Sequence, residues 1–385
     1  MISKPDQQTF LSQHALDGNW DRYQQLLADI TIADVEKALS AKAGSYTFDK
    51  LLALVSPAAE NHLEEMAQRS RDLTIQRFGP TIKLYAPLYV SNYCSNSCVY
   101  CGFNRQTEFE RKRLTVAEAV AEAEIIAAEG FRDILLVSSE DRGHITIDYL
   151  CELARKLRGK FSSIGVEIYQ CSSKEYANLF AAGIEAVTVY QETYNRTAYA
   201  KFHPAGSKAD YDMRLQAPSD AAAGKMRQIG LGSLLGLNDW RIETLALGEH
   251  GHFLMKRYWQ SRISFSFPRL RPAMDVKAPV FENPVSDKNL VQMITALRLC
   301  FADAGLVLST RESPDLRDKL MPLGITRMSA GSRTEPGGYS EHGKAVEQFQ
   351  ISDDRTPAEV AKVIRNQGFE AVWKDWDSAF NKKDS

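Results

Sequence analysis

Short apolar runs alternate with longer amphipathic stretches along most of the chain after residue 80. The apolar runs are rich in β-branched and aromatic residues, which is typical of buried strands. Eight of these runs are predicted to be strands: 82–90, 133–139, 165–171, 186–192, 231–237, 263–270, 306–312 and 327–332. The stretches between them carry apolar side chains at helical spacing. Strands that alternate with helices predict a parallel sheet.

Eight strand–helix units within about 250 residues favour a closed sheet. The predicted fold class is therefore α/β, with a (β/α)8 TIM-type barrel. An open doubly wound sheet, with one or two strands wrongly assigned, is the alternative. Both architectures collect the C-terminal ends of their parallel strands at one face, and functional residues are expected there.

Helical segments precede and follow the predicted barrel. The first part of the chain is polar with a helical pattern, and the last part opens with a capping box of Thr356 and Glu359. No clear ninth strand follows, and a helix folded back over the barrel or a partner surface would both suit this tail. We therefore expect an N-terminal helical extension (1–80), the barrel (81–335) and a C-terminal tail (336–385).

Composition narrows the class of protein. The 385 residues are 44% hydrophobic and 25% charged, which is typical of a globular chain. A formal net charge of −2 gives no electrostatic attraction for nucleic acid, and no stretch is apolar enough to span a membrane. The basic run Arg111-Lys112-Arg113 is interpreted as the solvated start of a helix. The N-terminal "MISKPDQQTF" lacks a secretory core and six cysteines are too few for a disulfide scaffold, so we expect a cytoplasmic protein with free thiols.

Three of the six cysteines lie close together directly after the first predicted strand. Cys94, Cys98 and Cys101 form the pattern C-x3-C-x2-C. A four-iron cubane cluster is usually held by four thiolates, so three thiolates on one loop would leave one iron open to a small molecule. Structural zinc and inert cysteines are the alternatives. Zinc prefers four closed ligands, and the other cysteines are isolated in the sequence, while a Ser/Asn-rich loop suits inert buried thiols poorly.

The segment "CSNSCVYC" (94–101) resembles the signature of the radical S-adenosylmethionine (SAM) superfamily. The resemblance implies a [4Fe–4S] cluster on the three cysteines, with SAM chelated to the open iron through its amino and carboxylate groups. Reductive cleavage of SAM would then yield a 5′-deoxyadenosyl radical. Tyr100 and Phe103 are expected to line the adenine pocket, with core packing as the alternative for both.

The same resemblance suggests residues that hold SAM. Glu140 ends the segment "SSED" (138–141), which stands where the superfamily has a Gly-Gly-Glu-like segment and departs from it. Glu192 ends the fourth predicted strand, and Arg214 follows it. A zwitterion needs one group of each sign, which an acid and an arginine provide. The glycines of "IGLGSLLGL" (229–237) are expected to permit close approach of the adenine.

Longer segments resemble the tyrosine lyases of thiamine thiazole biosynthesis: "APLYVSNYC", "CVYCGFN", "VYQETYN", "YWQSRISFSFPRLRP", "LSTRESP", "PGGYSE" and "VWKDWDS". The resemblance implies cleavage of the Cα–Cβ bond of L-tyrosine to dehydroglycine and p-cresol, with thiazole synthase and an electron donor such as flavodoxin or ferredoxin as partners. The tail around Trp373 and Trp376 is the expected contact for thiazole synthase.

Two related lyases and a non-catalytic metal-binding barrel are the alternatives to that function. One relative is a tyrosine lyase of hydrogenase assembly, which carries a second cysteine cluster near its C-terminus. No cysteine follows Cys300 here, so ligands for such a cluster are missing. The other relative is a tryptophan lyase of antibiotic pathways, which less of this chain resembles.

The substrate carboxylate needs a cation deep in the barrel mouth. Arg311, at the end of the seventh predicted strand, is the first choice, because residues at this end of a barrel strand are commonly functional. Ser329 and Ser332 on the eighth strand are expected to add hydrogen bonds. Three other arginines close to predicted strand ends are alternatives to Arg311 for this contact: Arg269, Arg271 and Arg333.

Overall fold

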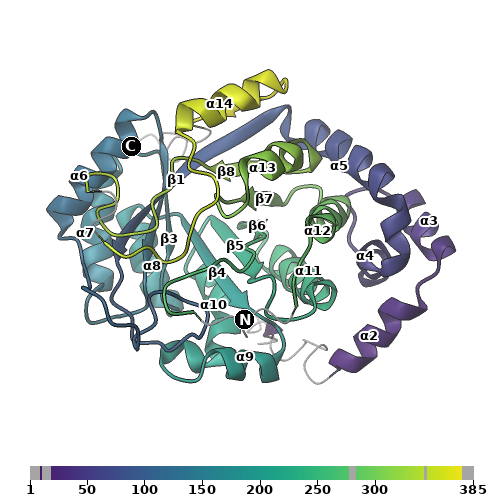
Figure 1. The fold of residues 1–385 in the computed structure, drawn as a ribbon, viewed down its shortest axis with the longest axis horizontal. Coiled ribbons are helices and arrows are strands. Elements are labelled where there is room, and N and C mark those ends of the chain that lie inside the picture. Colours follow the sequence, from purple (N-terminus) through teal and green to yellow (C-terminus); the bar gives the residue numbers. More distant parts are fainter. Residues whose placement is uncertain (1–8, 11–18, 277–282, 342–344, 375–385) are drawn as a thin grey trace, which may run out of the picture.

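Eight parallel strands close into a barrel, as predicted (Figure 1). The computed structural model describes residues 9–10, 19–276, 283–341 and 345–374. The barrel strands are β1 (Thr81–Ser91), β2 (Asp133–Ser138), β3 (Ser163–Glu167), β4 (Ala186–Glu192), β5 (Gln228–Ser233), β6 (Arg262–Ser266), β7 (Gly305–Leu308) and β8 (Arg327–Ser329). Closure is achieved by β1, which pairs with β2 along its second half and with β8 nearer its start.

Several strands end earlier than their apolar runs predicted. The third run was predicted to reach residue 171, but β3 ends at Glu167, and β7 ends at Leu308 rather than at 312. At these points the chain leaves the ladder and turns over the barrel mouth. The residues beyond Glu167 and Leu308 therefore belong to the loops that line the mouth, where side chains remain available for chemistry.

The glycines of β5 make room for neighbouring side chains. A Cβ on Gly232 would lie 2.7 Å from the ring of Tyr190, and a Cβ on Gly230 would lie 2.9 Å from Oγ1 of Thr188. Gly230 and Gly232 therefore accommodate side chains of the adjacent strand β4, and the approach of adenine to the segment 229–237 stays a prediction.

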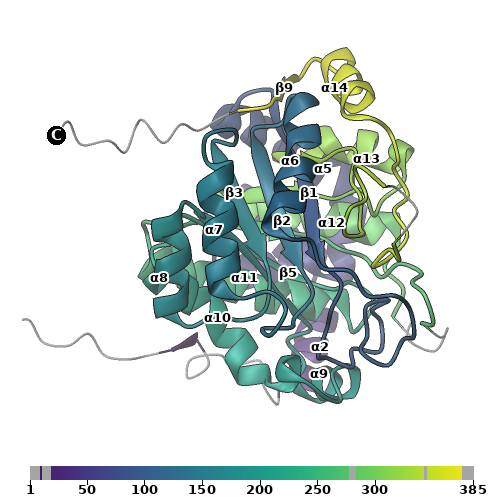
Figure 2. The ribbon, with the colours of Figure 1, turned by 90° about the vertical axis from the view of Figure 1, so that its left-hand side faces the viewer.

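An outer layer of helices surrounds the barrel (Figures 1 and 2). It comprises α6 (Val116–Ala128), α7 (Ile147–Leu157), α8 (Ser173–Ala182), α9 (Arg196–Phe202), α10 (Tyr211–Ala223), α11 (Trp240–Arg257), α12 (Asp287–Cys300) and α13 (Pro314–Leu320). Side chains cap several of these helices. Thr115 and Glu118 form a capping box at α6, and the Ser313 hydroxyl accepts a hydrogen bond at the start of α13. No helix in the described ranges combines the length and apolar character needed to cross a bilayer.

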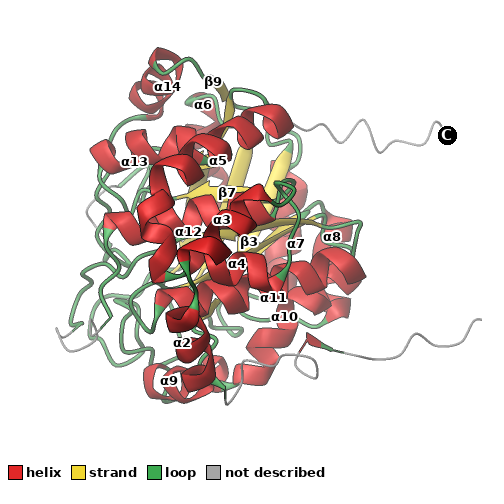
Figure 3. Ribbon diagram, turned by 90° about the vertical axis from the view of Figure 1, so that its right-hand side faces the viewer, coloured by secondary structure: helices red, strands yellow, loops and turns green. Residues whose placement is uncertain are grey.

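The helical N-terminal part braces one side of the barrel (Figure 3). It contains α2 (Trp20–Asp29), α3 (Ile32–Ser40), α4 (Phe48–Val55) and α5 (Leu63–Phe78), of which α4 and α5 pack against α11 and α12. Lys50 is buried in this contact, and its Nζ donates to the Leu299 carbonyl at 2.9 Å. The N-terminal peptide "MISKPDQQTF" lies outside the described residues except for its last two positions.

The tail adds a ninth strand, which the sequence analysis missed. Helix α14 (Pro357–Asn366) ends before Gly368, whose φ of 81° favours glycine, and β9 (Glu370–Val372) then pairs with the first residues of β1. Trp373 follows and its ring lies edge-on to Phe131, with centroids 5.1 Å apart. The pairing of β1 with β2 begins only at Ala86, so the first residues of β1 have a free backbone edge on the side opposite β8, and this edge accepts the short strand. Trp376 lies outside the described residues.

Candidate active site

Two adjoining chambers occupy the barrel mouth, with about 880 and 590 Å³ of space, part of it open to solvent. The outer chamber lies against residues 94–101, whereas the inner chamber lies deeper among Tyr85, Tyr89, Ser329 and Ser332. Six residues line both chambers: Val137, Glu167, Tyr190, Pro268, Arg311 and Phe349. The shared lining shows that the two chambers adjoin.

Main-chain hydrogen bonds fix the cysteine loop over the outer chamber. Ser97 N donates to the Ala205 carbonyl at 3.0 Å, and Val99 N donates to the Phe202 carbonyl at 3.2 Å. Gly206, with a φ of 100°, lies against Asn96, and a Cβ there would be 2.2 Å from Asn96 Oδ1. Since backbone groups of two loops satisfy each other, the thiols do not depend on their own hydrogen bonds for position.

Arg111 ties down the base of the same loop. Its guanidinium donates to four main-chain carbonyls, those of Asn92, Phe103, Asn104 and Thr107, at 2.6–3.1 Å. The interpretation of this basic run as a solvated start of a helix is therefore wrong for Arg111. Four carbonyls within reach of one planar donor hold the loop in a single conformation.

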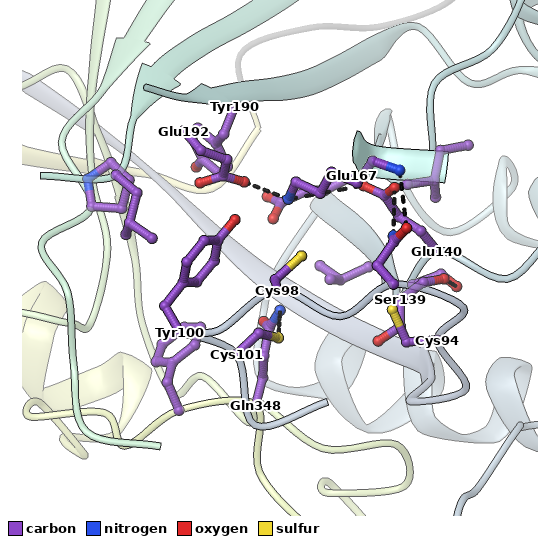
Figure 4. Close-up of a pocket in the computed structure, with 18 of the residues that line it drawn as sticks. Cys94, Cys98, Tyr100, Cys101, Ser139, Glu140, Glu167, Tyr190, Glu192 and Gln348 are labelled. Carbon is purple, nitrogen blue, oxygen red and sulfur yellow. Dashed lines mark hydrogen bonds and ion pairs between the residues drawn. The ribbon is translucent and has the colours of Figure 1, made fainter. Parts of the chain in front are cut away.

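All three loop cysteines line the outer chamber. Figure 4 shows Cys98 and Cys101 close together, with Cys94 near Ser139. Burial raises the pKa of all three thiols, that of Cys94 to about 11, so a bound cation is needed to hold them as thiolates. No group of three or more His, Cys, Asp or Glu among the described residues is arranged for a single metal ion. A cubane sets a different requirement, because each thiolate binds its own iron, and the donors present fit it.

A charged network lies beside the cysteines. Arg214 donates to Glu140 at 2.8 Å and to the Tyr190 carbonyl at 2.8 Å, while Lys208 donates to Glu192 at 2.6 Å. Burial opposes the charge on Lys208, but Glu192, Glu140 and Cys98 together outweigh it and raise the pKa of Lys208. The structure thus brings the three predicted residues together and adds Lys208, which the sequence analysis missed because it follows no strand.

The backbone of Glu192 is unusual. Its φ of 69° lies in the left-handed region, which costs a residue with a side chain about 1–3 kcal/mol. A bulge in the β4–β5 ladder between Tyr190 and Glu192 accompanies this conformation. Its effect is to turn the Glu192 carboxylate into the outer chamber, where it lies in Figure 4.

Tyr100 lines the apolar side of the outer chamber, whereas Phe103 does not. The Tyr100 hydroxyl lies 2.7 Å from His203 Nε2, and His203 Nδ1 lies 2.8 Å from the Tyr199 carbonyl. Burial lowers the pKa of His203 to about 3, so the ring is neutral and fixes Tyr100. Phe103 is fully buried, edge-on to Tyr89 at 6.3 Å, so the core-packing alternative describes it.

Arg311 reaches both chambers from the loop after β7. Its guanidinium lies 3.5 Å from the centre of the Phe349 ring and donates to the Arg269 carbonyl at 3.3 Å. Both of these contacts are with neutral groups. The positive charge of Arg311 therefore faces the cavity, at a position suited to a substrate carboxylate.

The two predicted serines line the inner chamber. Ser329 Oγ accepts a hydrogen bond from Thr310 N at 3.2 Å. Ser332 is 2% exposed, and its Oγ has no hydrogen-bond partner within the described structure. A buried hydroxyl without a partner is costly, so the Ser332 hydroxyl is available to a ligand or an ordered water in the inner chamber.

Arg269 lies outside the lining of both chambers, contrary to its prediction as a catalytic residue. It forms ion pairs with Glu312 and with Asp287, the latter at 2.8 Å. Glu312 is 1% exposed, so this pairing neutralises a buried charge. Arg269 therefore stabilises the loops around the mouth.

Glu167, at the end of β3, was missed by the sequence analysis. It lines both chambers, and burial raises its pKa to about 7, a rise that the positive charge of Arg311 opposes. The available signal was a single acid within the apolar run "GVEIYQC". Its position inside the cavity depends on the early end of β3, which the apolar pattern concealed.

Comparison with known proteins agrees with this geometry. Two family models match, the Radical SAM superfamily over residues 88–247 and the Biotin and Thiamin Synthesis associated domain over residues 266–370. The 2-iminoacetate synthase of Escherichia coli (strain K12) is 44% identical over 361 residues, covering 94% of this chain and 95% of that protein. The 2-iminoacetate synthase of Salmonella typhimurium is 43% identical over 360 residues, covering 93% and 94%.

A solved structure also covers most of the chain. The FeFe-hydrogenase maturase HydG from Carboxydothermus hydrogenoformans has a TM-score of 0.84 at 31% identity, covering 92% of this chain and 83% of that chain. A barrel with three thiols on the loop after its first strand is that of a radical SAM enzyme, which uses a [4Fe–4S] cluster and SAM. Within this class, the chain belongs to the 2-iminoacetate synthase family of lyases.

Proposed function

We propose that the chain cleaves the Cα–Cβ bond of L-tyrosine to dehydroglycine (2-iminoacetate) and p-cresol, while SAM is cleaved to methionine and 5′-deoxyadenosine. Dehydroglycine would supply the thiazole ring of thiamine. The observation that carries the proposal is a chamber lined by three loop thiols that adjoins a cationic, aromatic chamber. Membership of the 2-iminoacetate synthase family supports the substrate.

The outer chamber would hold the cofactors. Cys94, Cys98 and Cys101 would bind the cluster, and the carboxylates and cations of the network around Glu192 and Arg214 would hold the amino and carboxylate ends of SAM. When bound, the cluster and SAM supply a 5′-deoxyadenosyl radical. The chain's own part is to position the reacting groups and to enclose them away from water.

The inner chamber would hold tyrosine. Arg311 would bind its carboxylate, with hydrogen bonds from Ser332 and Ser329, and the ring would lie among the apolar and aromatic side chains of the barrel interior. An arginine recognises a carboxylate strongly, because it can donate two parallel hydrogen bonds.

Glu167 would accept a proton from the tyrosine ammonium group. It lies on the wall shared by both chambers, so it is within the part of the cavity between cofactor and substrate. An ammonium nitrogen holds no free electron pair. A deprotonated carboxylate can remove a proton from the ammonium group and leave a neutral amine.

Turnover should therefore depend on pH. With the pKa of Glu167 raised to about 7, the carboxyl is protonated below that pH and cannot accept a proton. We expect kcat/KM for tyrosine to rise with pH through about 7 and then to level off. In Glu167→Gln we expect kcat/KM to fall about 100- to 10,000-fold and this rise to disappear.

Glu243 provides a matched control for that pH profile. Burial also raises its pKa to about 7, but it bonds to Thr193, Tyr194 and Ser233 and lines neither chamber. We expect Glu243→Gln to keep the rise of kcat/KM with pH. If the rise is lost in Glu243→Gln and retained in Glu167→Gln, the role assigned to Glu167 is wrong.

The function is tested by the products of reconstituted protein. Anaerobic protein with an assembled cluster, SAM, a reductant and tyrosine should form p-cresol, 5′-deoxyadenosine and glyoxylate, the hydrolysis product of dehydroglycine. Products from tryptophan instead would assign a related lyase. A protein that binds zinc and makes none of these products would be a non-catalytic barrel.

The remaining proposals concern partners and compartment. We expect an external one-electron donor such as flavodoxin or ferredoxin, a complex with thiazole synthase, and action in the cytoplasm, where thiols stay reduced. We also propose the division into an extension (1–80), barrel (81–335) and tail (336–385). Co-elution of the purified chain with thiazole synthase tests the complex, and loss of co-elution on deletion of residues 375–385 would assign it to the end of the tail.

A further inference from the structure

A segment far from the cysteines in sequence closes over one of them. Residues 345–350, which we call the strap, cross the barrel mouth, and Gln348 and Phe349 line the outer chamber. Gln348 N donates to the Thr334 carbonyl at 3.0 Å, and Gly102 N donates to the Gln348 carbonyl at 3.3 Å. A Cβ on Gly102 would lie 2.8 Å from that carbonyl oxygen, so glycine permits the contact. The strap is thereby fixed against the residue that follows Cys101.

The side-chain amide of Gln348 bridges Cys101 and the inner chamber. Its Nε2 lies 3.8 Å from Cys101 Sγ, and its Oε1 accepts a hydrogen bond from the Tyr89 hydroxyl at 2.7 Å. In Figure 4 the Gln348 side chain lies beside Cys101. The Tyr89 hydroxyl bonds to the amide oxygen of Gln348, so the amide nitrogen points its N–H toward the Cys101 sulfur. The main-chain N–H of Phe103 also donates to Cys101.

We propose that Gln348 is a positioning residue that sets the reduction potential of the cluster through its N–H···S hydrogen bond to Cys101. Reduction adds negative charge to the cluster and its thiolates, and a donor pointed at a thiolate sulfur stabilises that charge. The bond therefore raises the potential and favours the reduced cluster. Tyr89 orients the amide from the wall of the substrate chamber, so the inner chamber and the cluster share one hydrogen-bonded chain.

The test is the cluster potential, measured by redox titration followed by electron paramagnetic resonance, in protein without SAM or tyrosine. Gln348→Met keeps the length of the side chain and removes the donor. We expect the equilibrium constant for reduction to fall about five- to tenfold, as for the loss of one hydrogen bond, where tenfold is about 59 mV for one electron. Tyr89→Phe leaves the amide in place without its orienting partner, so a smaller fall in the same direction is expected.

Gln350→Met is the matched control, since it makes the same change two residues away on the exposed face of the strap. It should leave the potential at the wild-type value. An unchanged potential in Gln348→Met with a full cluster would overturn the inference, as would an equal fall in Gln350→Met. If Gln348→Met does not retain its cluster, the inference is judged by the potential of Tyr89→Phe: a fall supports it and an unchanged potential overturns it. The inference rests on the three-thiol cluster alone, so failure of wild-type protein to cleave tyrosine would leave it standing, whereas absence of iron from wild type would refute the cofactor assignment.

Discussion

Replacing Cys98 with alanine is expected to remove bound iron and all cleavage of SAM together. Cys98 is the central cysteine of the loop, is 5% exposed and lines the outer chamber. The two remaining thiols would hold only two corners of a cubane that already relies on three. The nearby carboxylates of Glu140 and Glu192 cannot replace the missing thiolate, because they already pair with Arg214 and Lys208.

The measurement is iron and sulfide per chain after anaerobic reconstitution, followed by 5′-deoxyadenosine formed with a strong reductant. Cys98→Ala should be colourless, with both quantities at background. Cys151→Ala is the control, because Cys151 is buried on α7 away from the chambers and its loss should cost only about 1 kcal/mol of stability. A Cys98→Ala protein with a full cluster would contradict the assignment of the loop.

Arg311→Gln is expected to separate cofactor binding from tyrosine turnover. The substitution keeps a polar side chain but removes the charge that we assign to the substrate carboxylate. Truncating one partner of a buried charge pair costs about 2–5 kcal/mol, so kcat/KM for tyrosine should fall at least about 30-fold. Iron content and the spectrum of the cluster should not change, because the loop cysteines are held by contacts that do not involve Arg311.

The control is the same substitution at Arg333, a rival candidate for the carboxylate contact, which lies in the loop after β8 and lines neither chamber. Tyrosine kinetics of Arg333→Gln should match the wild type within about threefold, the range of small surface effects. Comparable losses in the two variants, or a normal KM in Arg311→Gln, would move the carboxylate contact to another residue such as Arg271, which lines the outer chamber.

Local pattern was sufficient for the barrel because each strand is buried on both faces. Runs such as 133–139 and 186–192 are mostly apolar and differ clearly from the capped helices that separate them. The ninth strand was different, since β9 has three residues and is stabilised by the free edge of β1. A strand that short carries no pattern of its own, and the partner that makes it a strand is far away in the sequence.

The site residues also fall into those that the sequence could identify and those that it could not. Cys94, Cys98 and Cys101 could be recognised because one short loop carries all three, and their spacing is itself the chemical requirement. Arg269 and Arg311 are both arginines beside strand ends, and the sequence could not rank them by environment. Only packing shows that Glu312 and Asp287 neutralise the first, whereas the second faces the cavity.

The amino-acid sequence by itself determined the order of the eight barrel strands and the thiol trio, because neighbouring residues carry both. Tertiary structure alone decided which ionisable groups meet in the cavity. Glu167, Lys208 and Gln348 come from β3, the loop before α10 and the strap, and only the closed barrel brings them within reach of the cysteines. Their roles depend on burial and on charges contributed by distant segments, and these quantities do not exist until the chain has folded.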